Sequence, residues 1–220
     1  MRPVLAALAL TFTLPVAAQA PSLDGAVLLG VEAEPTAYRG RPALRVTDVT
    51  AAADATDRRL VLFPATRLGD GTLEVWVAAR PTPDAPPQAR GFVGLAFGAA
   101  PEAAAFEAFY LRMTNGRAAA QPLRNHASQY ISSPDWPWDR LREERPAAYE
   151  AYVDLEVGAW TRVRIEVDGD TARLYVHDGD HPTILAERLT AGDGVGAVGL
   201  WVGPWTEAFF SGLNVRPEGD

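Results

Sequence analysis

Cysteine is absent from the 220 residues. The chain therefore has no disulfide bond, no cysteine nucleophile and no cysteine to carry a lipid anchor. No His/Cys spacing typical of a zinc site is present either. A stable fold must come from the hydrophobic core, and a domain of about 200 residues buries roughly 70% of its unfolded surface, which is sufficient.

Positive charge is also in short supply, since 20 Lys and Arg face 28 Asp and Glu, for a formal net charge of −8. Nucleic acids and anionic membrane surfaces are bound through basic patches. This charge balance argues against both kinds of partner and fits an exported protein, but it does not identify a ligand.

Long apolar runs are missing after the first twenty residues. In residues 1–20, Arg2 provides a positive start, Val4 to Val16 an apolar stretch, and Ala18-Gln19-Ala20 a small-x-small cleavage pattern. The stretch is too short for a helix to span the roughly 30 Å of a bilayer. We predict a Sec signal peptide cleaved near Ala20, one domain over residues 21–220, and a secreted or periplasmic protein without a membrane anchor. The alternative is a buried first helix.

Short apolar segments punctuated by Gly, Pro and Asp fill the rest of the chain, the pattern of an all-β sandwich. The strongest signal is residues 161–176, where two alternating runs flank Asp168-Gly169-Asp170, a hairpin turn. Further strands are predicted in residues 26–34, 43–48, 58–66, 71–80, 91–99, 108–117, 196–203 and 207–215. Residues 81–90 are expected to form a surface loop. Residues 117–159 are expected to be irregular, with a short helix after Asp139 that ends before Pro146.

The C-terminal third carries four patterns with a common likeness. They are W-x-x-V-R-I-x-V from Trp160, A-x-L-Y-V from Ala172, G-x-V-G-L-W from Gly196 and F-S-x-L-x-V from Phe210. Together they resemble the concanavalin A-like lectin/glucanase (laminin-G-like) domains, and also the related group of 3-keto-disaccharide hydrolases. The resemblance implies a two-sheet antiparallel jelly-roll sandwich. Core spacing and turn glycines carry it, so it specifies fold better than function.

Glucanases of this fold carry E-x-D-x-E on one strand, and the nearest match here is "YVDLE", residues 152–156. Asp154 and Glu156 are in phase with Glu150, but Tyr152 occupies the first acidic position. This departure prevents transfer of the glucanase mechanism, and a solvated strand face is the simpler interpretation.

The segment "RNHASQYISSPDWPW", residues 124–138, has the composition of a carbohydrate site. His126 is a candidate base with Asp135 or Glu150 as its carboxylate partner. The candidate ligand-binding residues are Arg124, Asn125, Tyr130, Trp136 and Trp138, joined by Trp205 from a later turn. Their planar donors and ring faces suit sugar hydroxyls and sugar rings. The alternative is a structural loop whose rings plug a gap, because long ordered loops also bury rings.

The leading hypothesis is an exported, lectin-like protein that binds a carbohydrate or similar polyhydroxylated ligand on its concave sheet, with residues 124–138 as one wall. The alternatives are a glycoside hydrolase-like or lyase-like enzyme using His126, and a scaffold that binds a protein partner. No metal or other cofactor is predicted. Calcium at the acidic turns 168–170 and 177–181 is a further alternative, since hairpin turns use the same residues. Trp201 is assigned to the core or, alternatively, to the groove.

Overall fold

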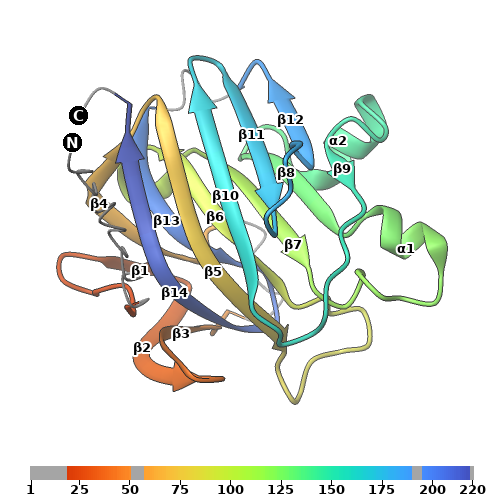
Figure 1. Cartoon of the computed structure of the whole chain (residues 1–220), viewed down its shortest axis with the longest axis horizontal. Coiled ribbons are helices and arrows are strands. Elements are labelled where there is room, and N and C mark those ends of the chain that lie inside the picture. The colour runs from red at the N-terminus through yellow and green to blue at the C-terminus, as the bar shows by residue number, and fades with distance from the viewer. Residues whose placement is uncertain (1–18, 51–56, 190–194, 219–220) are drawn as a thin grey trace, which may run out of the picture.

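The alternating segments form two antiparallel sheets packed face to face (Figure 1). The computed structural model describes residues 19–50, 57–189 and 195–218, so most of the predicted signal peptide lies outside the described residues. Within those ranges each sheet has seven strands. This confirms the predicted all-β jelly-roll sandwich.

We name the sheets after their central strands. The β6 sheet contains, in spatial order, β1 (Val27–Leu29), β4 (Leu60–Leu68), β13 (Gly196–Val202), β6 (Phe92–Ala99), β7 (Phe106–Arg112), β8 (Ser128–Ser133) and β9 (Glu150–Ala151). The β5 sheet contains β12 (Ile184–Glu187), β11 (Thr171–Val176), β10 (Thr161–Asp168), β5 (Gly71–Pro81), β14 (Thr206–Pro217), β3 (Arg41–Asp48) and β2 (Val31–Tyr38).

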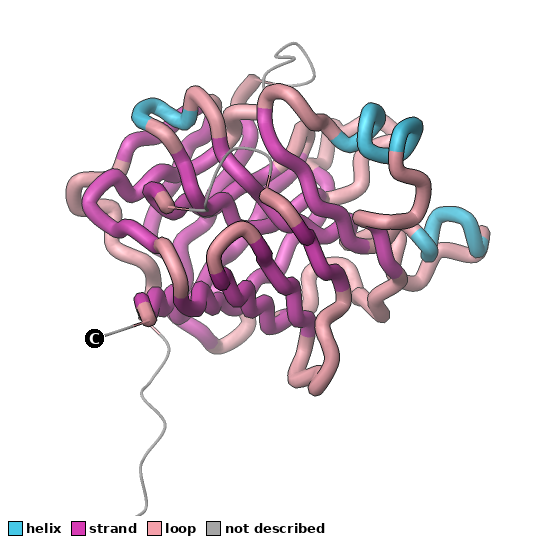
Figure 2. The backbone as a smooth tube through the Cα atoms, turned by 90° about the horizontal axis from the view of Figure 1, so that it is seen from above, coloured by secondary structure: helices cyan, strands magenta, loops and turns pink. Residues whose placement is uncertain are grey.

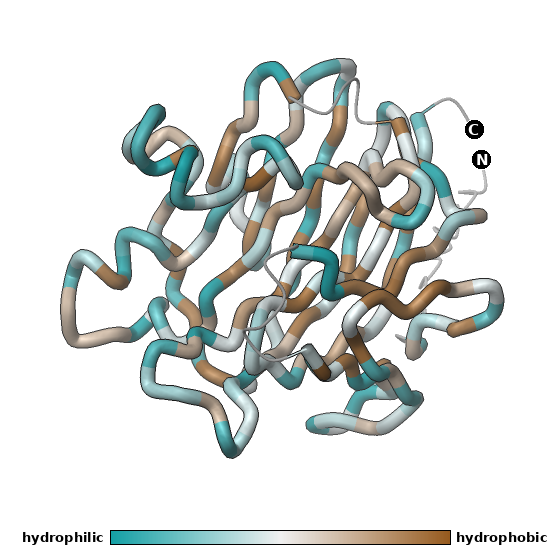
Figure 3. Tube along the Cα trace, turned by 180° about the vertical axis from the view of Figure 1, so that it is seen from behind, coloured by the Kyte–Doolittle hydropathy of each residue, from teal (hydrophilic) through white to brown (hydrophobic). Residues whose placement is uncertain are grey.

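The core lies between the two sheets. In β5, Leu73, Val75 and Val77 are fully buried, as their alternation predicted, because successive side chains of a strand point to opposite faces. The 161–176 hairpin is confirmed, with Asp168 paired to Thr171 across the turn. Hydrophobic positions, in brown, run along the strands in Figure 3.

Residues 117–159 are less irregular than predicted. They contain α1 (Gln121–Asn125), β8, α2 (Trp138–Glu144) and β9. The prediction missed β8 because all six of its residues are buried, so that the strand shows no alternation of polar and apolar side chains. The predicted short helix corresponds to α2. The segment 124–138 thus runs from a helix through a strand to a second helix.

The helices lie at the ends of the sandwich. Figure 2 shows α1 and α2 together at one end, and the turn η2 (Pro101–Ala103) lies elsewhere at the periphery. The described part of the chain includes no helix long and apolar enough to cross a membrane. Several buried polar side chains, among them Arg112, Asn115 and Gln129, lie on or beside the strands near α1 and α2.

Candidate functional site

A row of five paired residues crosses the outer face of the β6 sheet, the face turned away from the core. Trp201 on β13 pairs with Gly94 on β6, Gly94 with Tyr110 on β7, Tyr110 with Gln129 on β8, and Gln129 with Glu150 on β9. Directly opposed residues on neighbouring strands share a face. Strand register therefore brings an indole, a phenol, an amide and a carboxylate into one line.

A cavity of about 480 Å³ lies beside this row, and one member of the row, Tyr110, lines it. Its walls come from the strands, from both helices and from loops. The lining includes Phe92, Tyr110, Arg112, Leu123, His126, Trp138, Arg142, Ala89, Arg90, Asn115, Pro204 and Trp205. We call it the aromatic pocket, because four of these residues are Phe, Tyr or Trp.

Tyr110 lies between two supports at the floor of the aromatic pocket. Its ring centroid is 4.8 Å from that of Trp201, and Arg112 Nη2 donates a hydrogen bond of 3.1 Å to its hydroxyl oxygen. The lack of a side chain at Gly94 lets β6 lie close to β7 beside Tyr110, since a Cβ on Gly94 would lie 2.1 Å from the Phe109 carbonyl oxygen. Burial raises the pKa of Tyr110 to about 12, although the charge of Arg112 opposes the rise. The phenol therefore keeps its proton at neutral pH.

Arg112 connects the floor to the wall. Its side chain is 6% exposed, and Nη1 donates to the His126 carbonyl oxygen at 3.0 Å and to Glu150 Oε1 at 3.1 Å. Nη2 donates to Gln129 Oε1, also at 3.1 Å. A buried guanidinium is tolerated only when its donors are paired, and this network pairs them.

Glu150 is the carboxylate on which the cations converge. Its side chain is 4% exposed and accepts two hydrogen bonds from Arg142, Nε to Oε2 at 3.0 Å and Nη2 to Oε1 at 2.5 Å. Burial by itself would raise the pKa of Glu150. The hydrogen bonds from Arg142 and the charges of Arg112, Arg142 and His126 outweigh burial and hold the pKa below its usual value. Glu150 is therefore ionised at neutral pH.

His126 follows α1 and brings an imidazole to the same carboxylate. Its Nδ1 lies 2.9 Å from Glu150 Oε2, although the two groups are not aligned as a hydrogen bond. The side chain is 33% exposed and lines both the aromatic pocket and a neighbouring hollow of about 420 Å³, which Asn125 and Glu150 also line. The imidazole is thus accessible from two sides.

The two indoles of the pocket are held by their own elements. Trp138 begins α2 and is 43% exposed, with the Arg142 guanidinium 4.7 Å from its ring centroid, the spacing that i and i+4 give on a helix. Trp205 has a positive φ of 59° in its turn. Its N–H donates to Asp48 Oδ2 at 2.8 Å, and its carbonyl accepts from the Thr82 N–H at 2.9 Å. Contacts within the protein thus hold the ring of Trp138 and the backbone of Trp205.

Asn115 supplies a hydrogen-bond acceptor with no partner. The residue is 3% exposed, and its Nδ2 donates to the His126 carbonyl oxygen at 3.0 Å. Its Oδ1 is buried and has no hydrogen-bond partner among the described residues. A buried acceptor left unpaired costs about 1–3 kcal/mol.

Four of the residues proposed from the sequence meet around the aromatic pocket: His126 and Glu150 as a pair, and Trp138 and Trp205 in the lining. Asn125 lies at the neighbouring hollow. The remaining four lie elsewhere, and each has another role.

Arg124 donates to the carbonyl oxygens of Ala118 and Ala119 at 2.7 and 2.8 Å. Asp135 is exposed in the turn after β8, and its backbone carbonyl accepts a hydrogen bond from Arg140. Trp136 packs beneath the Arg140 guanidinium, which lies 3.9 Å from its ring centroid.

Tyr130 belongs to the inter-sheet core rather than to the pocket. It is 2% exposed, and its hydroxyl donates to the buried Glu107 at 2.5 Å. It points inward because it pairs with Phe109, a core residue of β7, and paired residues share a face. Asp154 and Glu156 of "YVDLE" are exposed, in line with the solvated face expected for them, and both pair with Arg117.

Sequence reasoning missed Tyr110, Arg112, Asn115, Gln129 and Arg142. The one signal for Arg112 was its position directly after the largely apolar segment Phe106–Leu111. Nothing local distinguished Gln129 or Asn115.

No known protein-family model matches the chain, and no curated protein matches it. Solved structures do. A carbohydrate-binding module, CBM66, from Bacillus subtilis superposes with a TM-score of 0.54 at 15% identity, covering 86% of this chain and 96% of that one. The chain has the concanavalin A-like jelly-roll fold.

Two further proteins share this jelly roll. A cellulose-induced protein superposes with a TM-score of 0.51 at 10% identity, covering 88% of this chain and 89% of that chain. A Bacillus subtilis protein of unknown function with a galectin-like fold superposes with a TM-score of 0.50 at 13% identity, covering 88% and 90%. At these identities the likeness shows the fold alone. The predicted jelly-roll fold is confirmed.

The ionisation of Glu150 predicts how stability depends on pH. A carboxyl whose folded pKa is lowered contributes stability above its unfolded pKa of about 4.3 and loses it as the pH falls through the folded value. We expect the Glu150→Gln variant to be less stable than the wild type at pH 7, because Arg112 and Arg142 lose a buried partner. The difference in the free energy of unfolding between the two proteins should narrow as the pH falls from about 5 to 3.

Urea unfolding of both proteins across this pH range measures the gap. The comparison removes the contributions of other carboxyls, which both proteins share. A gap that stays constant or widens in acid would contradict the assignment of a lowered pKa to Glu150.

Proposed function

We propose that the chain is an exported carbohydrate-binding protein that holds its ligand in the aromatic pocket. The observation that carries the proposal is the lining of the pocket, in which Trp138 and Trp205 accompany the protonated Tyr110 and the polar side chains of the wall. Sugars offer apolar ring faces and hydroxyl groups that both donate and accept. Aromatic faces and mixed polar groups match that chemistry.

The compared structures support the same class of ligand. CBM66 is by name a carbohydrate-binding module, and the superposition covers 96% of its chain. The predicted signal peptide supports export from the cytoplasm. An exported protein encounters extracellular polysaccharides.

An enzymatic function is the second candidate, and the His126–Glu150 pair favours it. A hydrolase of the usual glycosidase kind needs two carboxyl groups across a cleft, one of them protonated. The described lining of the aromatic pocket includes no carboxylate, and Glu150 beside it is held ionised by two arginines. Binding without hydrolysis is therefore the function that the geometry supports best.

A glycan screen followed by titration tests the proposal. We expect Trp138→Ala to weaken binding of the selected glycan by about tenfold or more, since a buried aromatic contact contributes about 2 kcal/mol at a binding hot spot. Tyr152→Ala is the control, because Tyr152 is also a large exposed aromatic, 54% exposed, and lies outside the pocket lining.

The outcomes separate the candidates. Equal losses in both variants, or no glycan bound by the wild type, would contradict the proposal. Release of reducing sugar by the wild type but not by His126→Ala would favour the enzyme instead.

A further inference from the structure

The aromatic pocket is a cationic site on an acidic protein. The charged residues in its lining are Arg90, Arg112 and Arg142, and His126 adds a titratable ring. No Asp or Glu belongs to the described lining, although the whole chain has a formal net charge of −8. Two carboxylates outside the lining, Glu150 and Asp57, act electrostatically on Tyr110, and Glu150 is already paired with two of the arginines.

The three arginines differ in what they have left to bind. Arg112 already donates hydrogen bonds to oxygens of Tyr110, Gln129, Glu150 and His126. Arg142 uses Nε and Nη2, the edge that grips a carboxylate bidentately, on Glu150. These two guanidinium groups form the scaffold of the pocket.

Arg90 is the arginine of the lining whose Nε and Nη2 donors make no hydrogen bond to the described residues. Its Nη1 donates to the carbonyl oxygens of Pro87 and Ala89 at 2.9 and 3.1 Å, which holds the side chain within its loop. Its own carbonyl accepts from the Thr114 N–H at 3.1 Å. Within the described residues, Arg90 has no ion-pair partner, and its Nε and Nη2 make no hydrogen bond to protein.

We propose that the aromatic pocket binds a sugar that carries a carboxylate, a uronate, with Arg90 as the residue that binds the carboxylate. The inference rests on the proposed function and narrows its ligand class. A planar fork of donors matches a carboxylate better than a hydroxymethyl group. The cationic lining also stabilises an anion that the rest of this acidic surface would repel.

Matched pairs of short oligosaccharides test the proposal. The two members of each pair differ only at C6, which is a hydroxymethyl group in one and a carboxylate in the other, and the pairs cover the gluco, galacto and manno series. We expect at least one uronate member to bind the wild type about ten- to a hundredfold more tightly than its neutral partner at low salt, as charge-assisted hydrogen bonds do. The preference should shrink at high salt.

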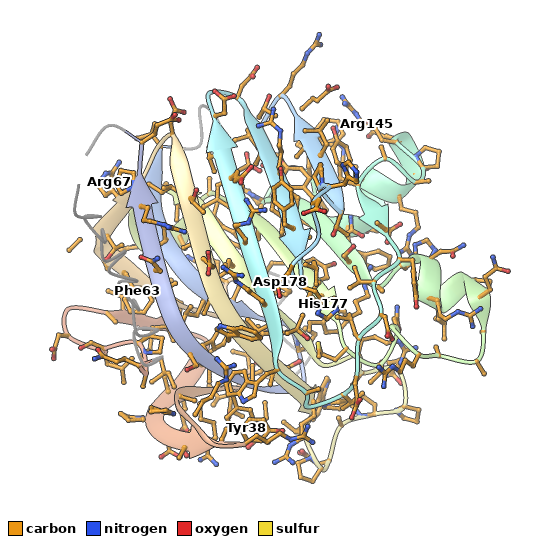
Figure 4. All side chains as sticks on the ribbon, viewed as in Figure 1. Tyr38, Phe63, Arg67, Arg145, His177 and Asp178 are labelled. Carbon is orange, nitrogen blue, oxygen red and sulfur yellow. The ribbon has the colours of Figure 1, made fainter. Side chains whose placement is uncertain are left out.

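Two variants locate the preference. Arg90→Gln should reduce the ratio of uronate affinity to neutral affinity to near one, and circular dichroism with thermal unfolding checks that the variant is folded. Arg67→Gln removes the same charge from an exposed position on β4 and should keep the full preference. Figure 4 labels Arg67 on the opposite side of the molecule from Arg145, which lies beside α2.

Each other outcome has a definite meaning. Neutral members that bind as tightly as uronates would overturn the inference and leave the proposed function standing. A full preference retained in Arg90→Gln would overturn it as well. Failure of every member to bind would contradict the proposed function itself and the inference with it.

Discussion

Replacing Arg112 by methionine is expected to lower the free energy of unfolding by about 3–5 kcal/mol, the usual cost of removing one partner from a buried ion pair. The arginine is 6% exposed and is the shared donor to Glu150, Gln129, Tyr110 and the His126 carbonyl. Methionine fills much of the volume but donates nothing, so that the buried acceptors lose their partner together. For a chain of this length the loss corresponds to about 6–20 °C in Tm.

Chemical denaturation of Arg112→Met and of Arg117→Met measures this effect against a matched control. Arg117 also pairs with two carboxylates, Asp154 and Glu156, but its side chain is 58% exposed. Solvent screens such pairs, and we expect the control to leave the unfolding midpoint nearly unchanged. A similar small loss in both variants would contradict the network described for Arg112.

A double variant tests whether Arg112 and Glu150 act as a unit. Once Glu150→Gln has removed the carboxylate, adding Arg112→Met should cost less than it does alone. Contacting charges of this kind usually show coupling energies of about 0.5–3 kcal/mol. Strictly additive losses would show that the two residues contribute independently.

Replacing Trp201 by alanine is expected to cost about 3–5 kcal/mol, as large-to-small substitutions of buried aromatic residues do. Trp201 is 3% exposed, its indole N–H donates to the Asp57 carbonyl oxygen at 2.6 Å, and its ring supports that of Tyr110. The substitution leaves a cavity beside Tyr110 and removes a hydrogen-bond donor. The floor of the aromatic pocket should therefore lose both stability and ligand affinity.

Trp138→Ala is the control that separates the two roles of tryptophan here. Trp138 is 43% exposed, and its removal should change the free energy of unfolding by no more than about 0.5 kcal/mol, as surface substitutions usually do. We expect Trp201→Ala to lower both stability and binding, and Trp138→Ala to lower binding alone. A large loss of stability in Trp138→Ala would show that it belongs to the core.

The alternating strands could be predicted because a strand places every second side chain on the core face. Val163, Ile165 and Val167 show this in β10, where each is buried and each neighbour is partly exposed. The same rule missed β8, whose two faces are both covered. It also could not tell that Tyr130 points into the core while Gln129, its neighbour, points to the network of Arg112.

The sequence by itself therefore determined the fold class, the main strands, the 168–170 hairpin and the candidate residues His126, Glu150, Trp138 and Trp205. Only the tertiary structure decided that these four meet, that Tyr110, Arg112 and Asn115 join them, and that Arg124, Tyr130, Asp135 and Trp136 do not. The reason is physical. Alternation is a local property of one strand, whereas the site depends on the register of five strands, β13, β6, β7, β8 and β9, whose pairing joins residues far apart in the chain.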